Sequence, residues 1–175
     1  MKIIFRTTRA FVDAAHRDLA RPHPFAAERV AFITIRATAA RRSLLLLAEG
    51  YYPVADEDYV DDPRVGAMMD QEAIRKALNL ALLQEVGVIH VHEHGHHGRP
   101  GFSHIDLSEQ LRFVPDFFSV RPEMPHGALV LSENRATGRV WLGAERIEPI
   151  GEFNVMGSRL LVDDITQPER VRTTA

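Results

Sequence analysis

The chain has 175 residues, of which 45% are apolar and 26% are charged, and its formal net charge is −3 at pH 7. This composition is typical of a soluble globular domain, and it leaves no basic surplus for binding nucleic acid. The absence of cysteine excludes disulfides and thiolate metal sites, so a bound metal would need nitrogen and oxygen ligands.

Residues 1–22 do not have the pattern expected of a secretory signal peptide, because charged residues interrupt the apolar ones. Its longest apolar run, LLLLA at residues 44–48, is far too short to cross a bilayer. We therefore expect a cytoplasmic protein without a membrane partner.

The first part of the chain predicts strands and one helix. Residues 2–5 have strand composition, and residues 9–22 repeat apolar side chains at helical spacing before Pro22. Residues 29–37 form a nearly continuous apolar run that predicts a buried strand. Residues 41–54 predict the next strand, ending at Gly50 with Pro53 beyond it, and the acidic residues 55–63 predict a solvated loop.

The second part adds the clearest helix, at residues 70–85, with Asp70 as its N-cap and Gly87 near its C-terminal end. Residues 88–94 alternate β-branched and polar residues, which predicts a strand. A helix is expected from Ser103 to about Pro115, and residues 127–143 have the pattern of a β-hairpin. These elements predict one α/β or α+β domain over residues 1–165, with a frayed tail at 166–175.

Six of the nine histidines lie within residues 88–107. On a strand, the alternating His90, His92 and His94 would point to one face. Burying three imidazoles together is costly unless they are bonded, and a metal ion is their natural partner. His96 and His97 are expected in an exposed loop, and a metal storage or delivery role for this histidine-rich segment is one open alternative.

Two other patterns overlap this cluster. Ser103 and Asp106 have the spacing of an ordinary helix capping box. Residues 92–96 also match the H-E-x-x-H motif of zincin proteases, which requires a helix. Gly95 and the glycines and proline after it make this segment a poor helix. On a strand, moreover, Glu93 would point away from His92 and His94.

Taken together, the HEH segment, the loop GHHGRPGF, the SHID segment and Glu28 at the start of ERVAFITIRA resemble the JAMM (MPN/JAB) family of zinc isopeptidases. That family has His-x-His at a strand end, a short loop, Ser-x-x-Asp opening a helix, and a glutamate on an upstream strand. The resemblance covers about residues 1–145, and it implies an MPN/JAB-like domain with a central mixed sheet flanked by helices.

The resemblance implies zinc ligation by His92, His94 and Asp106, with Glu28 as the general base and Ser103 stabilising the oxyanion. Such a zinc ion lowers the pKa of water in its open coordination position.

His90 with His92 is the alternative ligand pair; otherwise His90 lies beside the ligands and supports them without binding the metal. We prefer His92 with His94 because eight residues (95–102) then precede Ser103, which is close to the loop length of the family.

The implied reaction is hydrolysis of a peptide or isopeptide bond after the C-terminal tail of a ubiquitin-like protein. The chain resembles stand-alone prokaryotic JAB proteins, whose implied partners are E1-like and E2-like enzymes. A non-catalytic metal-binding scaffold remains an alternative.

Overall fold

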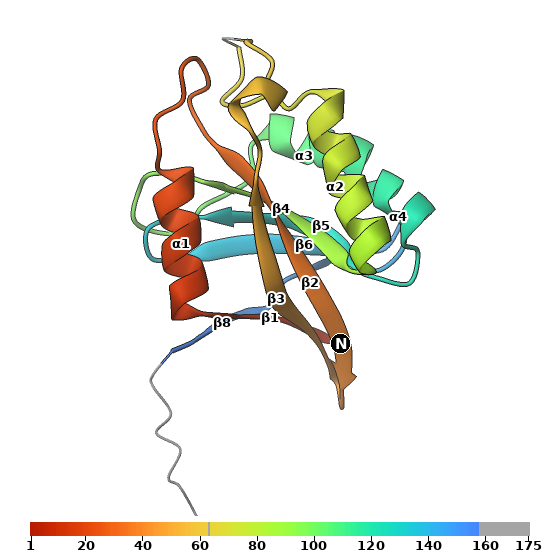
Figure 1. Ribbon diagram of the computed structural model, residues 1–175. Helices are drawn as coiled ribbons and strands as arrows, with labels where there is room; N and C mark the ends of the chain where they lie inside the picture. The colour runs from red at the N-terminus through yellow and green to blue at the C-terminus, as the bar shows by residue number, and fades with distance from the viewer. Residues whose placement is uncertain (63, 158–175) are drawn as a thin grey trace, which may run out of the picture.

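The computed structural model describes residues 1–62 and 64–157 of the chain. They form one eight-stranded mixed sheet in the order β7-β6-β5-β4-β2-β3-β1-β8 (Figure 1). The pairs β1–β3, β1–β8 and β4–β5 are parallel, and the other neighbouring strands are antiparallel. The strands are β1 (Lys2–Thr8), β2 (Val30–Ala40), β3 (Ser43–Pro53), β4 (Gly87–Glu93), β5 (His126–Leu131), β6 (Ala136–Trp141), β7 (Ile147–Pro149) and β8 (Glu152–Met156).

The helices cover both faces of the sheet. One face carries α1 (Arg9–Leu19), and the other carries α2 (Gln71–Gln84), α3 (His104–Phe113) and the short α4 (Phe117–Val120) (Figure 1). Short 3₁₀ turns, η1 and η2, occupy Asp56–Asp58 and Val114–Asp116. This arrangement confirms the predicted α+β class with a mixed sheet between helices.

The central strands are mainly apolar where both of their faces are buried. In β2, Ala31 and Ile33 join a core cluster that includes Leu19 of α1. The alternate residues Val30 and Phe32 pack in a second cluster with the alanines of α2. Burial on both sides therefore explains the continuous apolar run in β2 that the sequence displays.

Local signals set the ends of α2 as the sequence predicts, with one difference. The side chain of Asp70 accepts a hydrogen bond from the backbone N–H of Ala73, which caps the helix N-terminus. The C-cap is Glu85, in the left-handed conformation with φ of 57°, rather than a glycine. Gly87 instead begins β4, where an added Cβ would lie 2.2 Å from the carbonyl oxygen of Pro125.

Three strand features differ from the prediction or were not anticipated. The prediction that the strand after residue 41 ends at Gly50 is wrong, since β3 continues to Pro53. Strands β7 and β8 have no clear sequence signal, and β8 is placed by parallel pairing with β1.

The predicted frayed tail at residues 166–175 lies outside the described residues. Within the described residues, no helix has the length and apolar character needed to cross a membrane.

Candidate metal centre

The centre forms where the beginning of β2 meets the end of β4. These strands are antiparallel, and Val30 lies opposite His92. Glu28 lies two residues before Val30, and His94 immediately follows β4, so their side chains converge. One potential ligand atom each from Glu28, His92 and His94 lies within 4.8 Å of the others. These three residues make a candidate metal site, which we call the donor group.

His92 is the most deeply buried member of the donor group. Its side chain is 1% exposed, and its Nε2 atom is buried without a hydrogen-bond partner. Burial lowers the pKa of His92 to about 4, with the charge of Asp106 opposing the shift and that of His94 adding to it. The ring is therefore neutral near pH 7 and carries the lone pair that a metal requires.

Asp106 lies beside His92 on a different element. Its Oδ2 atom accepts a hydrogen bond of 2.7 Å from the N–H of Ser103 and lies 3.8 Å from His92 Nε2. The Ser103 hydroxyl oxygen in turn accepts a 3.1 Å bond from the N–H of Asp106. This capping box starts α3 and fixes the carboxylate next to His92. The structural and functional interpretations of this motif are thus compatible.

Glu28 approaches His94 from the opposite strand. Its Oε1 atom lies 3.8 Å from His94 Nε2, too far for a hydrogen bond. The Gly66 carbonyl accepts hydrogen bonds from the N–H groups of Ala27 and Glu28, and a Cβ at Gly66 would lie 3.1 Å from the Glu28 carboxyl. Burial raises the pKa of Glu28; His94 opposes this shift and Asp106 adds to it.

Arg29 holds the segment that carries Glu28, a role for which the sequence contains no evident signal. This nearly fully buried arginine donates to the carbonyls of Arg21 and Pro22 at 2.9 and 2.7 Å, and to Asp56 Oδ1 at 2.6 Å. The bonds tie the loop after α1 to the turn η1. These bonds therefore fix the backbone next to Glu28.

Glu93 is directed away from the donor group, as the strand alternation predicts. Its Oε1 atom lies 2.8 Å from Nδ1 of His16 on α1, which packs on the other face of the sheet. Residues 92–96 do not form a helix. The geometry that the H-E-x-x-H motif needs is therefore missing from this segment.

The remaining histidines of the cluster occupy different environments. His90 is buried, its ring contacts the rings of Phe32 and Phe113, and both of its nitrogens lack hydrogen-bond partners. Burial lowers its pKa to about 3. The donor group does not include His90. His96 and His97 are exposed, as expected from the sequence, and His104 is exposed on the surface of α3.

The site fits a divalent cation. His92 Nε2 is a buried acceptor without a partner, and the 3.8 Å spacings to neighbouring oxygens are near the separation of two ligands that share one ion. Zinc binds imidazole nitrogen and carboxylate oxygen at about 2.0–2.2 Å, usually with four ligands. Imidazole and carboxylate ligands also suit other transition metals, so the geometry supports a metal site without specifying the metal.

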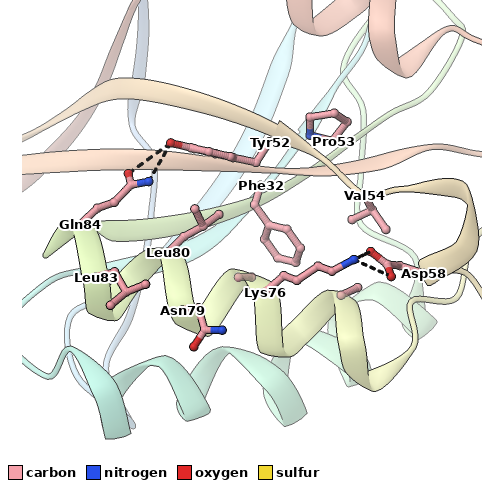
Figure 2. Close-up of a pocket in the computed structure, with 12 residues that line it drawn as sticks. Phe32, Tyr52, Pro53, Val54, Asp58, Lys76, Asn79, Leu80, Leu83 and Gln84 are labelled. Atoms are coloured by element: carbon pink, nitrogen blue, oxygen red, sulfur yellow. Dashed lines mark hydrogen bonds and ion pairs between the residues drawn. The ribbon is translucent and has the colours of Figure 1, made fainter.

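A separate pocket of about 360 Å³ lies between α2 and the strands β2 and β3 (Figure 2). None of the donor-group residues lines it. An ion pair between Lys76 and Asp58 and hydrogen bonds between Tyr52 and Gln84 lie at its two ends. Its lining is otherwise mainly apolar, including Phe32, Val54, Leu80 and Leu83.

Comparison of the sequence with models of known protein families and with curated proteins finds no match. The resemblance to JAMM enzymes therefore depends on the motif residues and on the chemistry that their arrangement allows.

Proposed function

We propose that this protein is a zinc-dependent hydrolase of the JAMM type, which cleaves the peptide or isopeptide bond after the tail of a ubiquitin-like protein. The observation that carries the proposal is the convergence of Glu28, His92 and His94, with Asp106 3.8 Å from His92. Two imidazoles and two carboxylates converge here from three separate parts of the chain. A structural ion pair would need only one group of each kind.

The two carboxylates would have different roles because their surroundings differ. Asp106 is fixed by the capping box and, with His92 and His94, would hold the metal. Glu28 has the longer side chain, is 33% exposed, and has no hydrogen bond to its carboxylate among the described residues. It is free to take a proton from the attacking water and to deliver it to the leaving amine.

Bound zinc would supply Lewis-acid chemistry, polarising the scissile carbonyl and lowering the pKa of water. Ser103 is exposed, and its oxygen already accepts a hydrogen bond from Asp106 N–H. The hydroxyl proton is still available for donation, so Ser103 would stabilise the oxyanion of the tetrahedral intermediate.

The substrate class follows from the JAMM resemblance alone. An extended tail laid beside the centre would bring its last carbonyl to the donor group. E1-like and E2-like enzymes of the same modifier would be the partners, and the protein would act as a deconjugase or precursor-processing enzyme.

The test compares zinc content and cleavage of ubiquitin-like proteins that carry a fluorogenic C-terminal amide, for the unmodified protein and two variants. Glu28→Gln should retain about one zinc and lose cleavage by roughly 10²–10⁴-fold. Glu93→Gln is the matched control, because it makes the same chemical change on the other face.

Full cleavage by Glu28→Gln would contradict the proposed base. Weak binding of several metal ions without cleavage by the unmodified protein would favour the storage alternative.

A further inference from the structure

Arg139 lies on the same face of the sheet as the metal centre, two strands away. In the register of the sheet, Arg139 of β6 pairs with Ala128 of β5, which pairs with His90 of β4. Paired residues in a sheet share a face, and His92 shares that face with His90. The side chain of Arg139 thus lies between the sheet and α3.

The guanidinium of Arg139 contacts two aromatic rings and helix α3. Its Cζ atom lies 4.7 Å from the ring centre of Trp141 and 5.6 Å from that of Phe102. Its Nε donates to Gln110 Oε1 at 2.8 Å, and its Nη2 donates to the Leu107 carbonyl at 3.2 Å. One arginine therefore binds α3 at two points and also contacts the residue just before Ser103.

The hydrogen bond between Arg139 and Gln110 matters for α3 because Gln110 faces the interior. It is the one fully buried residue of this ten-residue helix, at 1% exposure. A buried polar side chain needs hydrogen-bond partners, and Arg139 satisfies the Gln110 oxygen. Arg139 therefore gives α3 a buried polar attachment to the sheet, beside the apolar contact that Phe113 makes with the second core cluster.

The two anchor points follow Asp106 directly along α3. Leu107 is the next residue, and Gln110 lies about one helical turn farther along. Arg139 makes no direct hydrogen bond to the Asp106 carboxylate, although the charge of Asp106 partly offsets the effect of burial on the pKa of Arg139. Loss of these anchors would allow this turn of α3 to move relative to His92, which is fixed on β4.

We propose that Arg139 is a positioning residue for the metal centre, holding α3 through Gln110 and Leu107 so that Asp106 stays beside His92. This inference rests on the proposed role of Asp106 as a metal ligand. Residues outside the ligand set that orient ligands typically change metal affinity about 10–100-fold when they are replaced.

The test is a double-mutant cycle on zinc affinity, measured by competition with a chromophoric chelator. Arg139→Lys keeps the charge but cannot reproduce the two-point contact, so zinc affinity should fall about 10–100-fold. In an Asp106→Asn background, Arg139→Lys should change the affinity less than about twofold, because its effect passes through Asp106. Arg146→Lys is the matched control, because Arg146 forms an exposed ion pair with Glu148. This variant should leave the zinc affinity unchanged.

The visible spectrum of the cobalt-loaded protein provides a second readout that does not depend on activity. Arg139→Lys should shift the spectrum in the same direction as Asp106→Asn. Should Arg139→Lys fail to fold, Gln110→Met removes one acceptor at similar volume and carries the same expectations.

An equal loss of zinc affinity in both backgrounds, or no loss in either, would overturn the positioning role while leaving the proposed function intact. Failure of the unmodified protein to bind zinc would overturn both.

Discussion

Nε2 of His94, just after β4, lies 3.8 Å from Oε1 of Glu28, just before β2, because the two strands are antiparallel. This approach converts a histidine-rich strand end into a candidate metal centre, because it adds an acidic oxygen to the two imidazoles. This distance is longer than a hydrogen bond, so direct bonding between the two side chains does not explain why they lie close together.

Metal binding should depend on His92 and not on the exposed histidines. We predict that His92→Gln lowers the zinc content from about one ion to less than about 0.2 per chain, because two neutral imidazoles are needed to compete with water. His104→Gln, on the surface of α3, is the matched control and should keep the full content. Elemental analysis after dialysis measures both, and equal loss in the two variants would point to adventitious binding.

Removal of the metal should lower the thermal stability. A ligand that binds only the folded state stabilises it by about 2.7 kcal/mol when its free concentration is 100 times the Kd. Thermal unfolding of the zinc-loaded protein should therefore occur several degrees above that of the chelated protein. The Glu93→Gln protein should show the same difference, whereas an unchanged midpoint in the unmodified protein would contradict a folded-state metal site.

Gly87→Ala should destabilise the fold. A Cβ at this position would lie 2.2 Å from the backbone oxygen of Pro125, and a backbone group cannot rotate away as a side chain can. We expect a loss of about 2 kcal/mol or more in the free energy of unfolding, measured in urea. Gly101→Ala is the control, with nothing within 4 Å of the added atom, and should change the free energy by less than about 0.5 kcal/mol.

His126 should make the metal-free protein sensitive to mild acid. Its Nδ1 accepts a hydrogen bond from Val88 N–H and its Nε2–H donates to the Arg121 carbonyl, so the folded state requires the neutral ring. Burial lowers its pKa to about 4, while the unfolded value is about 6.5. Between these pH values the unfolded chain therefore binds more protons than the folded state does. The stability of the fold then decreases as the pH drops from about 6.5 to about 4.

The expected contribution of His126 over this window is on the order of 3 kcal/mol. In His126→Asn the free energy of unfolding should depend less steeply on pH between about 4 and 6.5. His90 and His92 also have lowered pKa values and contribute in both proteins, so the difference between the two pH profiles isolates His126. Parallel profiles would show that His126 does not titrate on unfolding in this range.

Much of the fold was predictable because its signals are local. The helical period and the Asp70 cap identify α2, and the alternation of residues 88–94 identifies β4 and the shared face of His90 and His92. The spacing of Ser103 and Asp106 predicts the start of α3. These patterns involve neighbours within a few residues, so they can be recognised without the tertiary structure.

Tertiary structure decided which distant residues meet. The register of β2 against β4 brings Glu28 to His94, and the packing of α1 gives Glu93 a partner in His16. Strand β8 forms only through pairing with β1. Contacts of this kind depend on strand register and helix docking, which no local periodicity encodes. The sequence therefore determined the types of candidate ligand, and the tertiary structure decided which of them share one site.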